Sequence, residues 1–133
     1  MASRLRYDEC VSTAVLTTGT ADEFFARSRE RARKLDRGES IPAEIRVVFE
    51  DPADLIQVLS TERIRVLQAV RTRPIPVSQL ASEVKRDRQA VMRDVRLLES
   101  FGLLKTREAP NPGHGRQRIV APLAARYQLV ANI

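Results

Sequence analysis

The stretch Val77–Gly102, VSQLASEVKRDRQAVMRDVRLLESFG, decides the fold. Its first part predicts a short amphipathic helix over residues 77–85, because Leu80, Ala81 and Val84 share one helix face. A longer helix follows after a turn of about three residues, a spacing typical of a helix-turn-helix.

The longer helix is predicted between two end signals. Asp87 is suited to accept a hydrogen bond from the first free backbone N–H groups, so the helix begins at Arg88. Gly102 is suited to the left-handed conformation that ends many helices, which places the last helical residue at Phe101.

This helix has two chemically different sides on a wheel of about 100° per residue. One side carries three apolar residues, Val91, Val95 and Leu98. The opposite side carries four polar residues, Gln89, Arg93, Arg96 and Ser100. We expect the first side to be buried and the second to point away from the core.

The polar side suits contact with DNA. The second helix of a helix-turn-helix lies in the major groove, where Arg can bind guanine and Gln can bind adenine. Arg96 is expected to contact phosphate, or to pair with Glu99 or Ser100. A solvated helix face is the alternative. The expected DNA contacts are Arg86, Arg88, Gln89, Met92, Arg93 and Arg96, and in the preceding helix Ser78 and Gln79.

A hairpin is predicted after the second helix. Leu103–Glu108 and Arg116–Val120 are strand-like, and the turn formers of residues 109–115 give a tip of about seven residues between them. A hairpin at this position is typical of the wing of a winged helix. Four residues are expected to contact DNA from it, against the alternative of an ordinary solvated hairpin: Asn111, His114, Arg116 and Arg118.

The N-terminal part predicts a strand, a helix and a second strand. Residues 10–18 are rich in β-branched types, and Ile45–Glu50 forms the second strand-like run. Between them, the Thr20–Glu23 capping box begins a helix that ends at Lys34 or Arg37, before Gly38. One face of this helix carries Phe25, Ser28, Ala32 and Leu35.

The centre of the chain predicts two more helices. Asp51 and Pro52 begin a short one, and Ser60 caps the next. The core stripe of the latter is expected to contain Ile64, Leu67 and Val70, before Pro74 and Pro76 end it. Tyr127–Val130 is expected to add a last strand beside the N-terminal ones.

Composition favours a binding protein. A chain of 133 residues suggests one compact unit, and its net charge is +6. From Ser60 to Pro122 there are 13 basic and 6 acidic side chains, so the positive charge lies in the C-terminal half, where it attracts polyanions. Met1–Arg6 contains no apolar run like that of a secretion signal, and no stretch is apolar enough to span a membrane. We therefore expect a cytoplasmic protein.

The residues that enzymes and metal sites need are sparse. Cys10 and His114 are the only residues of their types, which supports neither a zinc site nor a nucleophile–base pair. The 5 glycines are scattered and form no phosphate loop. We expect no enzymatic activity, no metal and no cofactor.

The segment KRDRQAVMRDVRLLESFGLL, Lys85–Leu104, resembles the MarR-like predicted winged-helix regulators of bacteria and archaea. The likeness implies a homodimer that binds a palindromic operator, and some members of the family resemble antitoxins encoded beside a small toxin. Pro76 departs from the hydroxyl cap common in the family, and the tip NPGHG is longer and more basic than usual.

Taken together, the sequence predicts an α+β protein in two parts. Residues 1–50 form the strand–helix–strand extension, which we expect to mediate dimerisation, and residues 51–133 form a winged helix-turn-helix. The expected function is sequence-specific binding of double-stranded DNA by a transcriptional repressor. The alternative is an antitoxin that binds a small partner toxin and regulates its own operon.

Overall fold

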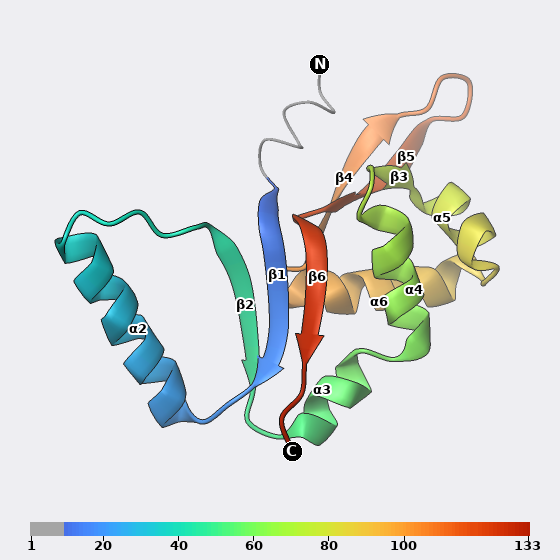
Figure 1. Cartoon of the computed structure of the whole chain (residues 1–133). Coiled ribbons are helices and arrows are strands. Elements are labelled where there is room, and N and C mark those ends of the chain that lie inside the picture. Colours follow the sequence, from blue (N-terminus) through green and yellow to red (C-terminus); the bar gives the residue numbers. More distant parts are fainter. Residues whose placement is uncertain (1–9) are drawn as a thin grey trace.

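The computed structural model describes residues 10–133 and has mixed α+β architecture, as predicted (Figure 1). Met1–Arg6, on which the expectation about a secretion signal depends, lies outside the described residues. The helices are α2 (Ala21–Asp36), α3 (Pro52–Val58), α4 (Thr61–Val70), α5 (Val77–Val84) and α6 (Arg88–Ser100). None of the helices in the described part of the chain has the length and apolar character needed to cross a membrane.

Helix starts follow the predicted capping chemistry. The Thr20 hydroxyl accepts from the Glu23 backbone N–H at 3.1 Å, and the Glu23 carboxylate accepts from the Thr20 N–H at 3.2 Å. Asp51, Ser60 and Asp87 each accept a backbone hydrogen bond at the start of α3, α4 and α6. Each satisfies an N–H group that has no partner inside its helix. All four predicted caps are thereby confirmed.

The first sheet joins the two ends of the described chain. Its order is β2 (Glu44–Phe49), β1 (Val11–Thr18), β6 (Ala124–Val130), and both pairings are parallel. The central strand β1 is hydrogen-bonded on both edges. The expected last strand beside the N-terminal strands is confirmed, and it begins three residues earlier than predicted, at Ala124.

The second sheet contains the predicted hairpin and one further strand. β4 (Leu104–Pro110) and β5 (Arg116–Pro122) are antiparallel, and the short β3 (Ile75–Pro76) pairs with the other edge of β5. The predicted seven-residue tip is wrong, because Ala109 and Pro110 extend the ladder opposite β5. Pro110 is tolerated there because it ends a strand at the edge of the sheet.

One core joins α4, α5, α6 and both sheets. Val91, Val95 and Leu98 are fully buried, as predicted. In α4 the predicted stripe is partly wrong, because Val66 is fully buried whereas Ile64 is only partly covered. Strand β1 adds Ala14 and Leu16, and β4 and β5 add Leu104 and Val120. The core thus fixes which side of α6 remains outside.

Helix α2 lies apart from this core (Figure 1). Its start and end agree with the prediction, with Gly38 in the left-handed conformation after the C-cap Arg37. Its apolar face is not packed, because α2 buries none of the residues Ala21–Asp36. The crossover from β1 to β2 therefore passes through a helix whose apolar side chains stay exposed within residues 10–133, although Arg27 forms an ion pair with Glu44 of β2 at 3.1 Å.

Candidate nucleic-acid interface

Helix α6 presents its polar side to solvent. Gln89, Arg93, Arg96 and Ser100 are all exposed, while the opposite side is buried in the core. Arg88, in the first turn, is exposed as well, and Met92 is half-buried between the two sides. The predicted division of α6 into a buried apolar side and an exposed polar side is confirmed.

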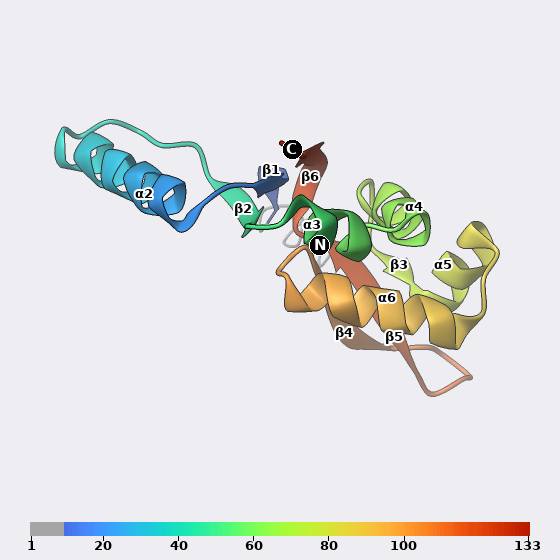
Figure 2. The ribbon, with the colours of Figure 1, turned by 90° about the horizontal axis from the view of Figure 1, so that it is seen from below.

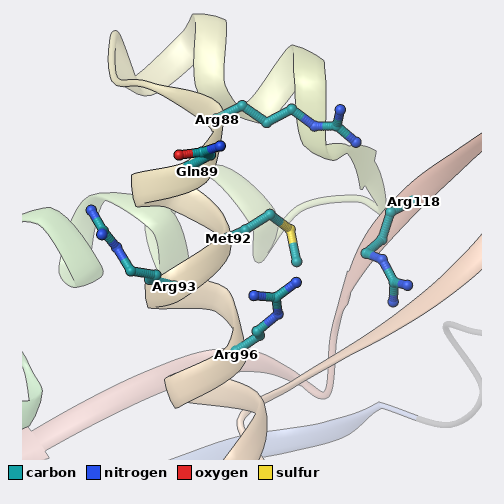
Figure 3. Close-up of a pocket in the computed structure, with 6 residues that line it drawn as sticks. All are labelled: Arg88, Gln89, Met92, Arg93, Arg96 and Arg118. Carbon is teal, nitrogen blue, oxygen red and sulfur yellow. The ribbon is translucent and has the colours of Figure 1, made fainter.

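The exposed side of α6 and strand β5 border one groove of about 470 Å³. In Figure 3, Arg88, Met92 and Arg96 extend from α6 toward the side where Arg118 lies, while Gln89 and Arg93 project to the other side. The structure brings five of the six residues predicted for this helix together with one predicted hairpin residue: Arg88, Gln89, Met92, Arg93, Arg96 and Arg118.

The arginines of α6 are not neutralised locally. Within residues 10–133, Arg88, Arg93 and Arg96 form no ion pair with an acidic side chain. The expected partners of Arg96 are engaged elsewhere, since Glu99 accepts from Thr106 and the Ser100 hydroxyl donates to the Leu97 carbonyl. The groove is therefore open, positively charged and lined by multiple hydrogen-bond donors.

Arg86, the sixth predicted residue of this set, lies in a different environment. Its guanidinium donates to Oδ2 of Asp94 on the inner side of α6, and the other carboxylate oxygen accepts from Nε of Arg63 at 3.0 Å. Arg63 also donates to the carbonyls of Gln57 and Val58, both at 3.0 Å. This cluster holds α4, α6, the end of α3 and the α5–α6 turn together.

The predicted contacts of the preceding helix lie at its exposed start. Ser78 and Gln79 occupy the first turn of α5, and both are exposed. Pro76 precedes that turn and offers no side-chain cap, in agreement with the noted departure from the family pattern. The α5–α6 turn is closed by Lys85, which takes the left-handed conformation at φ 57°.

The hairpin carries its cations close to one carboxylate. Arg116 donates from Nε to Glu108 at 3.2 Å, and Arg118 lies 3.6 Å from the other oxygen of Glu108. Arg118 also donates to the Thr106 hydroxyl at 3.2 Å, which orients its guanidinium. Glu108 lowers the net positive charge of this strand pair, and sequence analysis did not take it into account.

The tip of the hairpin spans residues 111–115. Asn111 N–H donates to the Gly115 carbonyl and His114 N–H to the Asn111 carbonyl, both at 2.8 Å. Gly113 and Gly115 take positive φ values near 80°, a conformation that glycine adopts without strain. The His114 side chain is exposed and Asn111 is half-buried, so these two predicted residues lie outside the α6 groove.

Sequence reasoning missed Asp94 and Arg63. A signal was present, because Asp94 falls roughly 60° from Val91 on the wheel of α6, at the edge of its buried stripe. A carboxylate placed there requires a partner when buried. Nothing local in the sequence identifies that partner, since Arg63 lies on another helix, 31 positions earlier.

These features define a class: an α+β protein that presents a cationic helix and a β-hairpin on one surface. Residues 58–125 match the HVO_A0114 family model, and the chain belongs to the HVO_A0114 family. The match covers α4, α5, α6 and the hairpin. The resemblance to MarR-like regulators stays a prediction.

Among solved structures, one that is similar to this chain over part of its length comes from an archaeon. It is described as a possible transcriptional regulator from Methanosarcina mazei Go1, with 22% sequence identity and a TM-score of 0.46. The similarity covers 55% of this chain and 63% of the regulator, so this chain spans less than two thirds of the regulator's length. At this level it carries no argument about function. No curated protein matches the chain.

Proposed function

We propose that this protein is a winged helix-turn-helix regulator of transcription that binds double-stranded DNA through α6 and the β4–β5 hairpin. The observation that carries the proposal is the exposed side of α6, whose arginines lack acidic partners within residues 10–133 while its opposite side is buried. A major groove about 12 Å wide admits a helix in this way.

In this proposal the two elements have different tasks. Arg88, Gln89 and Arg93 lie in the first half of α6 and read base edges, because Arg and Gln match the donor and acceptor pattern of guanine and adenine. Arg96 and Arg118 contact phosphates, which position the protein without reading sequence. Ser78 and Gln79 approach the backbone from the start of α5.

The test is binding to duplex DNA from the promoter of the protein's own gene. We expect log K to fall steeply and linearly with log salt between about 50 and 200 mM, since each neutralised phosphate releases a counterion. An excess of unrelated duplex controls for non-specific binding. A flat salt dependence, or no binding at low salt, contradicts the proposal.

Regulation is proposed as repression in the cytoplasm, by occupancy of an operator that overlaps the promoter. A reporter fused to that promoter should lose activity when the protein is supplied and regain it with an Arg93→Ala variant. The antitoxin alternative has a separate test: the neighbouring reading frame should be toxic alone and harmless with this protein. Without such a frame, only the repressor proposal stands.

A further inference from the structure

Helix α2 is joined to β2 by the ion pair of Arg27 with Glu44 at 3.1 Å, but none of its residues is buried by the rest of the described chain. It extends away from the body of the molecule, at the end opposite to α5 (Figure 2). Phe24, Phe25 and Leu35 are 50%, 56% and 62% exposed. A helix of 16 residues is marginal in water by itself, because most helices depend on packing of an apolar face. A surface outside this chain's own fold is needed to cover it.

One stripe of α2, made of four apolar residues and a serine, follows the spacing of a two-stranded coiled coil, and Phe24 lies beside it. Intervals of four and three residues alternate along one side of the helix, as in the a and d positions of a heptad repeat. The residues at these positions are Ala21, Phe25, Ser28, Ala32 and Leu35. This pattern favours a second helix as the partner, rather than a sheet or a flat surface.

The side chains of this stripe are complementary to themselves when the second helix runs antiparallel. With a two-fold axis near Ser28, Leu35 faces the partner's Ala21, and Ala32 is the stripe residue of the partner nearest to Phe25. Each large side chain then meets a small one, which is how packed layers interdigitate. A parallel pair would place Phe25 against Phe25 and leave the small residues facing each other.

Charge favours the same arrangement. The first turn of α2 carries Asp22 and Glu23, and the last turn carries Arg33 and Lys34. An antiparallel pair places each acidic end beside a basic end and opposes the two helix dipoles.

We propose that α2 is the interface of a homodimer and that its occupant is the antiparallel α2 of a second copy of this chain. The inference deepens the proposed function, because a two-fold dimer matches a palindromic operator. Since α2 and α5 lie at opposite ends of the molecule, such pairing leaves the α6 groove of each copy open (Figure 2).

The first experiment measures the mass in solution by light scattering and sedimentation. We expect a dimer, and for Phe25→Asp combined with Leu35→Asp a dimer dissociation constant raised by roughly 100-fold or more, as for loss of buried interface anchors. Ala26→Asp, an exposed position outside the stripe, is the matched control and should stay dimeric. A monomeric native chain, or a double variant that remains a tight dimer, overturns the inference.

The second experiment tests the direction of pairing with cysteines in a Cys10→Ser background. A mixture of Phe25→Cys and Ala32→Cys chains should form a mixed disulfide on oxidation, and Ser28→Cys should cross-link to itself, because the Cβ atoms must approach within about 4.5 Å. Phe25→Cys alone should not cross-link. Self-cross-linking of Phe25→Cys, or none in the mixture, overturns the antiparallel arrangement.

DNA binding distinguishes the two proposals. If the native chain binds its promoter as a monomer, the α2 inference fails alone; if it dimerises through α2 and ignores DNA, the proposed function fails alone. A native chain that is monomeric until a protein encoded by a neighbouring gene covers α2 also overturns the inference, in favour of a different partner.

Discussion

Arg63 on α4 donates a hydrogen bond from Nε to Oδ1 of Asp94 on α6, across 3.0 Å. Asp94 is 7% exposed and receives a second guanidinium from Arg86 in the turn before α6. The orientation of the proposed recognition helix thus depends on a carboxylate on its inner side, which does not face the groove.

Asp94→Ala is predicted to lower the free energy of unfolding by about 2 kcal/mol, because two partly buried guanidiniums lose their shared acceptor. Denaturant unfolding provides the measurement. The control is Glu83→Gln, which removes an exposed ion pair with Arg73 and should change stability by less than about 1 kcal/mol. If the two variants lower the free energy of unfolding equally, the Asp94 cluster contributes no more to stability than an exposed ion pair does.

Arg93→Ala is predicted to weaken promoter binding by about 1–3 kcal/mol and to relax base preference at one position, as loss of a base contact does. Arg116→Ala should instead weaken binding to all sequences alike, because Arg116, on the same strand as Arg118, is expected to contact phosphate and not a base. Binding to a set of single-base operator variants distinguishes the two patterns. Arg37→Ala, at the C-cap of α2 and away from the α6 groove, should leave binding unchanged. Identical base preferences for the Arg93 variant and the native protein would contradict the base-reading role.

Glu108→Gln is predicted to strengthen DNA binding. Glu108 pairs with Arg116 and lies near Arg118, so its removal frees two guanidiniums and deletes one negative charge facing the phosphates. We expect a gain of about 0.5–1 kcal/mol at low salt, typical of an exposed charge interaction, and a smaller gain at high salt. Titration at two salt concentrations measures it. Weaker binding of this variant would mean that Glu108 serves to position the arginines.

Tyr127 is predicted to make stability depend on alkaline pH. Burial raises the pKa of Tyr127 to about 12, while its hydroxyl donates to the Leu103 carbonyl at 2.6 Å and accepts from the Leu123 N–H at 3.2 Å. The folded state favours the neutral phenol, so this contribution is complete below the unfolded pKa of about 10 and is lost as pH rises towards 12.

The measurement is ultraviolet titration of a Tyr7→Phe variant, in which Tyr127 is the remaining tyrosine. We expect ionisation near pH 12 together with loss of stability over the same interval. Tyr127→Phe should remove this contribution to the pH dependence and lower stability at neutral pH by about 1 kcal/mol, through the lost hydrogen bonds. Ionisation of Tyr127 near pH 10 in the folded protein would contradict the raised pKa.

Local chemistry made much of this fold predictable. Thr20, Asp51, Ser60 and Asp87 cap helices because a side-chain oxygen meets a nearby backbone N–H, an interaction that a few consecutive residues specify completely. The two sides of α6 were predictable for the same reason, because helical periodicity alone places Val91 inward and Arg93 outward.

Interactions between distant parts of the chain were not predictable in this way. The pairing of Ile75 with Val120 and the Arg63–Asp94 bond each depend on where separate elements meet. The uncovered face of α2 illustrates the same limit: heptad spacing predicts an apolar stripe but does not determine whether the stripe packs within its own chain.

The parallel pairing of β1 with β6 has a consequence for biosynthesis. Val11 pairs with Ala124 and Thr17 with Val130, contacts separated by more than 100 positions in the chain. Such separations slow folding, because a long loop must close before the contacts form. One edge of the central strand β1 therefore has no hydrogen-bonding partner until Ala124–Val130 have left the ribosome. During translation this open edge is a site where another nascent chain can pair.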